Sequence, residues 1–391
     1  MTRQHRLATL AVQAGEDHRG QFHPLSTPIV QTSTFIFPTS LDVQRYSEGK
    51  SSAYMYTRYG NPTLHAAEVK IAALEGGEEG LVTASGMAAI STAALTVLHT
   101  GDEIVSSRNI YGGTFHFFNK VLSKFNIGTH YFDGDDLEAA ERLITPRTRL
   151  LYLETPANPT MRIIDLRRAV QIAKKHRLFS MVDSTFGTPV LQRPLKLGFD
   201  LVMHSVTKYL SGHSDIIGGA LVGSHKVISE IRDTMKRLGG IMDPTAAYFL
   251  LRGLKTLTVR VERQCETASR LARFLARHSR IERAHYPGLK SSPYHRLAVK
   301  QMGGLFGGMV AADLRGGRRA AMRFADRLRV FQNAASLGGV ESLISLPVLT
   351  SQWGYTPQQL RDVGITEGTV RLSVGVEDAR DLIEDIRQAL E

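Results

Sequence analysis

The side chains best suited to chemistry lie between Ser205 and Lys208, directly after the apolar run Leu201–Met203. The hydroxyls of Ser205 and Thr207 are suited to binding a phosphate. A partly desolvated lysine amine is a nucleophile that forms a Schiff base with an aldehyde. A second apolar run ends in Asp183. Two strands that deliver these groups to their carboxyl ends would build a site for an aldehyde that carries a phosphate.

Lys208 and Asp183 together predict pyridoxal 5'-phosphate as the cofactor, because its enzymes pair a lysine Schiff base with a carboxylate on the pyridinium nitrogen. Asn158 ends a third predicted strand. Asn158 could instead be a turn residue and Asp183 a helix N-cap. Ser205 and Thr207 could satisfy local backbone groups. Ligands of open parallel sheets bind at the carboxyl ends of the strands, so the convergence of three strand ends favours a ligand site.

A further phosphate contact is predicted at Ser85-Gly86-Met87, between a predicted strand at 81–83 and a helix that runs to about Leu98. The N–H groups at a helix N-terminus bind phosphate, and glycine lets the backbone approach the anion closely. An ordinary N-cap is the alternative. The spacings G-x-G-x-x-G and G-x-x-x-x-G-K-[ST] do not occur, which counts against dinucleotide and nucleoside triphosphate binding.

Two other residues have types and surroundings that suit a site. Tyr111 follows a predicted strand, where its ring could stack on a planar cofactor and its hydroxyl could move protons; loop packing is the alternative. Arg371 sits among apolar strand residues, where a guanidinium could bind a carboxylate through two hydrogen bonds or form an internal salt bridge.

The histidines, such as His204 and His213, have no metal-site spacing, so no metal is predicted.

Composition is that of a globular protein, with 42% hydrophobic and 22% charged residues among 391. The single cysteine, Cys265, excludes an intrachain disulfide framework, and no apolar run is long enough for a membrane helix. We therefore expect a cytoplasmic protein with no membrane partner. The net charge of +11 raises a second hypothesis, a basic nucleic-acid-binding protein. Dispersed cations and the Lys208–Asp183 pair argue against it, so we expect no nucleic-acid partner.

Helical and strand-like segments alternate from about residue 63 to 252, which predicts an α/β fold with a largely parallel sheet. The remainder reads as a smaller α+β domain. Strands are expected at 81–83, 103–106, 150–153, 179–182, 201–204, 219–222 and, in the second domain, within 303–312. Helices are expected at 63–74, from about 253 to 278, and at 318–328 and 377–390.

With these residues in place, the chain resembles the Cys/Met metabolism (transsulfuration) family of pyridoxal-phosphate enzymes over nearly its whole length. The motifs that carry the resemblance are Tyr56-Thr-Arg58-Tyr-Gly-Asn-Pro62, Ala84-Ser-Gly-Met87, Tyr111-Gly-Gly, Ser205-Val-Thr-Lys208-Tyr, Ser336-Leu-Gly-Gly and Val370-Arg371-Leu-Ser-Val-Gly375. The resemblance implies the type I fold of pyridoxal-phosphate enzymes, similar to aspartate aminotransferase. It has a large, mostly parallel seven-stranded sheet domain and a smaller C-terminal α+β domain.

The resemblance also implies a role for each site residue. Lys208 would carry the cofactor and Asp183 would hold its ring nitrogen protonated. Asn158 would contact the ring hydroxyl, and Tyr111 would stack on the ring and assist proton transfer. Arg371 would bind the substrate α-carboxylate. The phosphate would be held by the residues Ser85, Gly86, Met87, Ser205 and Thr207 of the same chain.

An N-terminal arm, residues 1–60, would contact a neighbouring subunit and bring Tyr56 and Arg58 to its phosphate. The cofactor domain would span 61–252 and the C-terminal domain 253–391. The resemblance implies a homotetramer made of two active dimers.

The resemblance predicts a carbon–sulfur lyase that acts on a sulfur amino acid by γ-elimination. Cystathionine, or methionine and homocysteine, would give 2-oxobutanoate, ammonia and a thiol. The alternative is γ-replacement, as in cystathionine γ-synthase or an O-acylhomoserine sulfhydrylase. Ser336 and Glu341 lie in a segment similar to cystathionine enzymes, and His116 stands where those often have an arginine; all three are predicted to bind substrate. Gly113 stands where methionine γ-lyases usually have a cysteine.

Overall fold

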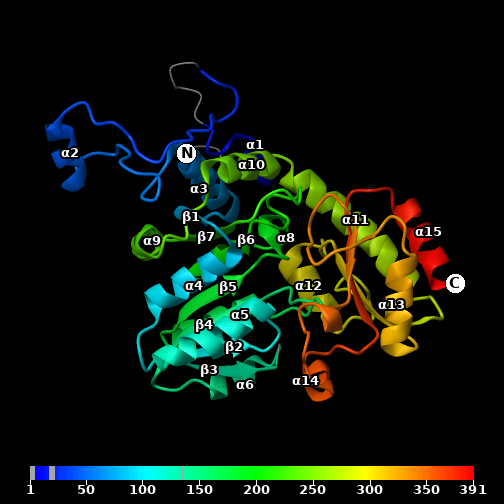
Figure 1. The fold of residues 1–391 in the computed structure, drawn as a ribbon. Helices are drawn as coiled ribbons and strands as arrows, with labels where there is room; N and C mark the ends of the chain where they lie inside the picture. Colours follow the sequence, from blue (N-terminus) through cyan, green and yellow to red (C-terminus); the bar gives the residue numbers. More distant parts are fainter. Residues whose placement is uncertain (1–4, 17–22, 134) are drawn as a thin grey trace.

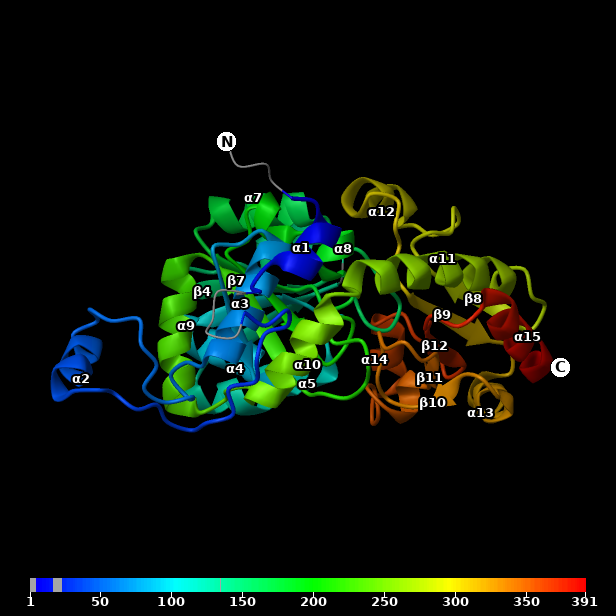
Figure 2. The same cartoon turned by 90° about the horizontal axis from the view of Figure 1, so that it is seen from above.

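The computed structural model describes residues 5–16, 23–133 and 135–391. Within these ranges the chain forms a seven-stranded sheet and, nearer the C-terminus, a five-stranded sheet. Figure 1 shows helices on both sides of the large sheet and the small sheet beside it. The long helix α11 (Leu257–Leu275) runs from the large part of the molecule across the smaller one (Figure 2).

The large sheet has the strand order β1-β7-β6-β5-β4-β2-β3, in which β7 is antiparallel to both its neighbours and the other pairs are parallel. The mostly parallel α/β architecture predicted from the sequence is therefore confirmed. The strands are β1 (Glu79–Thr83), β2 (Glu103–Ser107), β3 (Gly128–Phe132), β4 (Thr148–Glu154), β5 (Phe179–Asp183), β6 (Leu201–Ser205) and β7 (Gly219–Gly223).

Alternate residues of the central strands face two different helix layers. On β4, Leu150 and Tyr152 pack in the apolar cluster that includes α4 and α9, whereas Leu151 and Leu153 pack in the cluster that includes α7. Burial on both faces explains the continuous apolar runs of these strands. The helices of this part are α3 (Pro62–Glu75), α4 (Gly86–Val97), α5 (Gly112–His116), α6 (Leu137–Arg142), α7 (Leu166–Lys175), α8 (Thr188–Leu191), α9 (His225–Leu238) and α10 (Pro244–Leu254).

Helix α3 illustrates how local sequence fixes an element. The Asn61 side chain accepts a hydrogen bond from the Thr63 N–H, and Pro62 occupies the first turn. At the other end Gly76 adopts a left-handed conformation with φ 75°, which glycine tolerates best. The helix predicted at 63–74 is thus confirmed to within one residue at each end.

The small sheet has the order β10-β11-β12-β9-β8, with α11, α13 and α15 packed in its apolar cluster. The predicted strand at 303–312 is wrong over its first half: β9 begins at Met309, because Gly303, Gly304 and Gly307 take positive φ angles in a turn. The elements are β8 (Ile281–His285), α12 (His295–Met302), β9 (Met309–Leu314), α13 (Gly317–Arg327), β10 (Gln332–Asn333), β11 (Leu343–Ser345), α14 (Pro357–Asp362), β12 (Thr369–Ser373) and α15 (Ala379–Leu390).

The N-terminal segment extends away from this body. After α1 (Leu7–Gln13), the chain runs out to α2 (Ser40–Ser47), which lies far from the sheets in both views (Figures 1 and 2). Helix α2 buries none of its residues, and Ile36 and Leu25 are 96% and 87% exposed. Among the described residues, no helix has the length and apolar character needed to cross a membrane.

Candidate active site

A cavity of about 620 Å³, here called the central cavity, opens at the carboxyl ends of β4, β5 and β6 beside the N-terminus of α4. Residues from the small part of the molecule close its other side. The structure brings together here ten of the residues singled out in the sequence, which are Ser85, Gly86, Met87, Tyr111, Asn158, Asp183, Ser205, Thr207, Lys208 and Arg371. The parallel sheet explains this convergence, because consecutive strands end at one edge.

One end of the central cavity has the features of a phosphate site. The Ser85 side chain caps α4 by accepting from the Ala88 N–H at 3.0 Å. The N–H groups of Gly86 and Met87, in the first turn, have no acceptor within the helix. A Cβ atom on Gly86 would lie 3.1 Å from the Ser205 Cβ, so glycine permits this close approach. The Thr207 hydroxyl also accepts from the Gly218 N–H at 2.9 Å, which ties the 205–218 loop together.

Lys208 follows β6 and turns its amine toward the small part of the molecule, where Nζ donates to the Ser336 Oγ at 3.1 Å. Burial, together with the positive charge of Arg371, lowers the pKa of Lys208 to about 8. A lysine with this pKa is partly neutral near physiological pH, which makes it a competent nucleophile and proton acceptor.

Two carboxylates meet on neighbouring strands, since Glu154 is paired in register with Asp183. Burial raises the pKa of both, and the charge of Asp183 raises that of Glu154 further. The Glu154 carboxylate accepts from the Tyr111 N–H at 2.6 Å and from the Asn158 N–H at 3.2 Å. Asp183 accepts from the Thr185 N–H at 2.9 Å. A buried carboxylate pair of this kind is stabilised by a cationic donor placed against it.

Glu154 was not assigned a role in the sequence analysis, although its position carried the same signal as that of Asp183. Each is the acidic last residue of a buried, apolar strand. Through its two backbone contacts, Glu154 holds Tyr111 and Asn158 at the mouth of the central cavity.

Arg371, on β12, is only 6% exposed. Its Nη1 donates to Asn158 Oδ1 at 2.9 Å and its Nη2 to the Ser336 carbonyl at 3.1 Å, while burial lowers its pKa to about 10. Among the described residues no carboxylate pairs with it, and its Nε lacks a partner. The internal salt bridge considered above is therefore not formed in that part of the chain, and a carboxylate from a ligand would complete the site.

Tyr111 caps α5 at the entrance of the central cavity and is 47% exposed. Its ring lies over Gly113, where an added Cβ atom would come within 2.5 Å of the Tyr111 Cε1. Gly113 therefore permits the position that the Tyr111 ring occupies.

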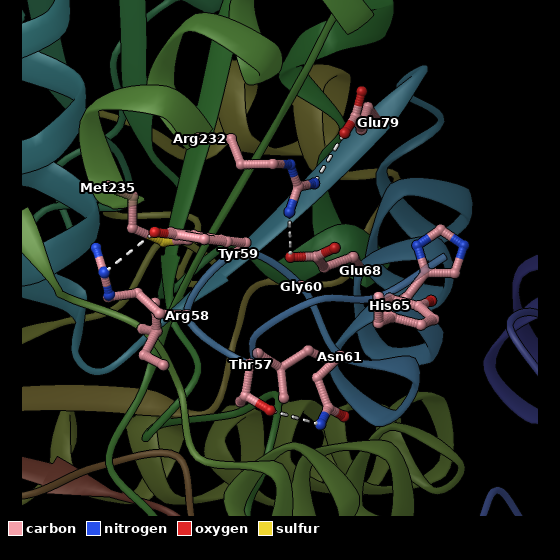
Figure 3. Close-up of a pocket in the computed structure, with 13 residues that line it drawn as sticks. Thr57, Arg58, Tyr59, Gly60, Asn61, His65, Glu68, Glu79, Arg232 and Met235 are labelled. Atoms are coloured by element: carbon pink, nitrogen blue, oxygen red, sulfur yellow. Dashed lines mark hydrogen bonds and ion pairs between the residues drawn. The ribbon is translucent and has the colours of Figure 1, made fainter. Parts of the chain in front are cut away.

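Five predicted site residues lie outside the lining of the central cavity, and of these Ser336 still touches Lys208, whose Nζ donates to its hydroxyl. His116 and Glu341 are exposed, and Glu341 accepts from the Ser214 hydroxyl at 3.1 Å. Arg58 lines a separate arm pocket (Figure 3), where it donates to the Lys236 carbonyl and its guanidinium lies 4.9 Å from the centre of the Tyr59 ring. Tyr56 is next to it and half-exposed. Within one chain, the structure does not bring the other four residues to the cofactor.

The arm pocket also contains a charge network that holds its wall in place. Arg232 on α9 bridges Glu68 on α3 and Glu79 on β1, with Nη to Oε distances of 3.0 and 2.8 Å (Figure 3). Burial raises the pKa of the Glu68 carboxyl group, and the adjacent Arg232 guanidinium acts in the opposite direction. Each side chain has a partner within the network, which indicates a structural role.

The central cavity fits pyridoxal phosphate on its own geometry. The free N–H groups at α4 suit the phosphate, the partly neutral amine of Lys208 suits the aldehyde, and the buried Asp183 suits a protonated ring nitrogen. These features define an enzyme of the pyridoxal-phosphate type I fold.

Comparison with known proteins agrees with this assignment. Residues 8–391 match the family described as Cys/Met metabolism PLP-dependent enzyme. An L-methionine gamma-lyase from Pseudomonas putida is 45% identical over 98% of this chain and 96% of its own length. A cystathionine gamma-lyase from Bacillus subtilis is 40% identical over 98% of this chain and 98% of its own.

Solved structures give the same result. The metB structure from Corynebacterium glutamicum superimposes with a TM-score of 0.92, at 35% identity over 99% of this chain and 98% of that one. The metY structure from Campylobacter jejuni, which contains N'-pyridoxyl-lysine-5'-monophosphate, has a TM-score of 0.95, at 32% identity over 99% of this chain and 100% of that one. The chain belongs to the Cys/Met metabolism family of pyridoxal-phosphate-dependent enzymes, and pyridoxal phosphate is its cofactor.

Proposed function

We propose that this enzyme cleaves the carbon–sulfur bond of a sulfur amino acid by γ-elimination, with water, to 2-oxobutanoate, ammonia and a thiol. The observation that carries the proposal is the placement of the Lys208 amine, with its pKa lowered to about 8, in one cavity with Asp183 and Arg371. The names of relatives at 40–45% identity support it, since they include an L-methionine gamma-lyase and a cystathionine gamma-lyase. When bound, the cofactor supplies an electron sink for carbanion chemistry next to the amino group.

Each residue of the central cavity has a task in that reaction. Arg371 binds the α-carboxylate of the substrate and so places Cα within reach of Lys208. The Lys208 amine takes the Cα proton and can return it to a neighbouring carbon. Asp183 would hold a positive charge on the ring nitrogen of the cofactor, and Asn158 would contact its ring hydroxyl. Tyr111, at the entrance, donates a proton to the departing sulfur.

The lining of the central cavity favours a substrate with one charged end. Its described cations are Lys208 and Arg371, both already assigned, whereas Phe186, Ile217 and Leu337 add apolar surface. The second amino-acid head group of cystathionine would find no further cation there. We therefore propose methionine or homocysteine as the preferred substrate and cystathionine as a poorer one. Within one chain, His116 and Glu341 are exposed and do not line the central cavity.

The subunit arrangement is also proposed. The exposed arm, with apolar Leu25 and Ile36, fits a contact with a neighbouring copy in a homotetramer. In that assembly Tyr56 and Arg58 would reach the partner's phosphate, and the units would be the arm (1–60), the cofactor domain (61–252) and the C-terminal domain (253–391). The buried thiol of Cys265, whose pKa burial raises to about 11, is in keeping with a cytoplasmic enzyme.

A substrate panel tests the proposal. Cofactor-loaded protein is given L-methionine, L-homocysteine, L-cystathionine and O-acetyl- or O-succinyl-L-homoserine, each with and without cysteine, and 2-oxobutanoate is measured. We expect the highest kcat/KM with methionine or homocysteine, independent of cysteine. If cysteine is required and cystathionine accumulates from an acylhomoserine, the enzyme is instead a γ-replacement enzyme.

A further inference from the structure

A second cavity, here called the outer pocket, lies apart from the central cavity and shares no lining residue with it. It has a volume of about 430 Å³, which suits a ligand of metabolite size. Its walls are the loop Thr160–Arg162, strand β8 and the segment Ser291–Tyr294 that leads into α12. Figure 2 labels β8 and α12.

The outer pocket contains hydrogen-bond donors that the chain leaves unused. The Arg162 guanidinium is half-buried and has no hydrogen-bond or ion-pair partner among the described residues. It lies across Gly364, where an added Cβ atom would come within 2.6 Å of Nη2. Thr160 is 6% exposed, and its hydroxyl is buried without a partner. The half-buried Arg162 guanidinium lines the cavity, so a ligand there can accept its hydrogen bonds.

The charges around the outer pocket favour an anion. Arg283, on β8, adds a second guanidinium. The nearby carboxylate of Asp313 already has partners, because the His285 Nε2 lies 2.8 Å from it and the Thr369 hydroxyl donates to it. Burial acts to raise the pKa of Asp313, but these contacts and the charge of Arg283 lower it. Glu282, the remaining carboxylate of the lining, is exposed at the rim.

We propose that the outer pocket binds a small oxyanion, a carboxylate or phosphate group held by Arg162, and that this binding alters the affinity for the amino-acid substrate. Guanidinium groups bind both kinds of anion through paired hydrogen bonds. The phenol of Tyr294, whose pKa burial raises, supplies a neutral donor beside it.

The connection to the active site runs through one short loop. The Arg162 carbonyl accepts from the Ala157 N–H at 3.0 Å, and the Met161 N–H donates to the Ala157 carbonyl at 2.8 Å. The next residue, Asn158, accepts from Arg371 in the central cavity. An anion that draws Arg162 outward therefore acts on Asn158, and Asn158 in turn orients Arg371, the arginine that binds the substrate carboxylate. We expect the effect in KM for the substrate, rather than in kcat.

The test uses the cofactor-loaded enzyme, in which the phosphate site of the central cavity is filled. Inorganic phosphate and succinate are titrated by calorimetry at constant ionic strength, and KM for L-methionine is measured at saturating anion. We expect saturable binding of at least one probe and a severalfold change in KM. In Arg162→Ala, binding should weaken about tenfold or more and the change in KM should disappear.

Two variants serve as controls. Arg252→Ala removes an exposed arginine outside the outer pocket and should leave binding unchanged. Arg283→Ala, on an exposed position of β8, should weaken binding without touching the 157–162 loop. The tighter of the two probes identifies the ligand class. Three results would each overturn the proposal. They are the absence of saturable binding, binding that persists in Arg162→Ala, and a KM that does not respond to saturating anion. Because anion binding is read without turnover, the calorimetric result is independent of the proposed function, whereas the KM result rests on methionine being a substrate.

Discussion

Lys208 differs from a surface lysine because it is buried and lies near the positive charge of Arg371, which together lower its pKa to about 8. The amine is neutral, and nucleophilic, above that pH. In protein stripped of cofactor, we expect the rate of recombination with pyridoxal phosphate to rise with pH and to level off above about 8. An ordinary lysine would continue to gain reactivity toward about 10.4. The yellow colour of the recombined enzyme, followed across a pH series, gives this rate.

The cofactor titrates in the same range, so a simple lysine derivative must be run in parallel as the reference. Replacing Arg371 by Met removes the neighbouring charge and should move the midpoint for the protein upward. A midpoint equal to that of the lysine derivative would show that the cavity does not tune the Lys208 amine.

Glu154 is the residue through which Tyr111 and Asn158 are both held. In Glu154→Gln the amide keeps one carbonyl acceptor and places an NH2 against one of the two backbone N–H groups. We expect kcat to fall by about tenfold, since losing a charged hydrogen bond costs about 1.5–3 kcal/mol. Glu138→Gln, a change on the exposed side of α6, is the matched control. An unaltered kcat in the Glu154 variant would show that Glu154 does not position the residues of the active site.

At this scale the sequence predicted the residues that sit at strand ends and missed those whose role depends on a partner across the sheet. Asp183 and Lys208 could be found because each follows an apolar run. Glu154 follows one too, but its function became visible only when the register placed it beside Asp183. The distances of His116 and Glu341 from the central cavity depend on the path of loops, for which residue type gives no signal.

Among the elements, α1 is attached to the body through a buried charge. The Lys70 Nζ on α3 donates to the carbonyls of Ala11 and Val12 and lies 3.1 Å from the Glu16 Oε1, with both side chains almost fully buried. Lys70→Met would leave Glu16 with Lys255 as its charged partner, together with the hydrogen bonds from the Thr27 N–H and hydroxyl. We expect a loss of about 3 kcal/mol in the free energy of unfolding, measured by urea denaturation.

Lys50→Met, which breaks the exposed pair with Glu48 beside α2, is the control and should change stability little. Equal effects of the two substitutions would mean that the buried contact does not stabilise the fold.

Whether the sequence predicted an element depended on how deeply that element is buried. Strands buried on both faces were predicted because they are continuous apolar runs. β3 was not predicted, since it lies at the sheet edge, is mostly half-buried and begins with Gly128, Thr129 and His130. The reversed direction of β7 could not be read from residue types, because direction depends on the path of the connection before it.

At the scale of the whole molecule, the proposed arm contact predicts that one subunit completes the active site of its neighbour. If Arg58 serves the site of a partner, then Arg58→Ala and Lys208→Ala damage different chains of one active pair. Mixing the two inactive variants under conditions that exchange subunits should restore activity, because a hybrid pair contains one intact site. A mixture that stays inactive, although mass analysis shows hybrids, would place Arg58 in the site of its own chain.

The central claim is that the Lys208 cavity breaks carbon–sulfur bonds. The most direct measurement is the release of 2-oxobutanoate and methanethiol from L-methionine by cofactor-loaded enzyme, compared with Lys208→Ala. We predict equal amounts of the two products from the wild-type chain and a rate about 10²–10⁴-fold lower in the variant, the range expected for losing a positioned acid–base group. Substantial turnover in Lys208→Ala, or no 2-oxobutanoate from any sulfur amino acid with the wild-type chain, would contradict the account.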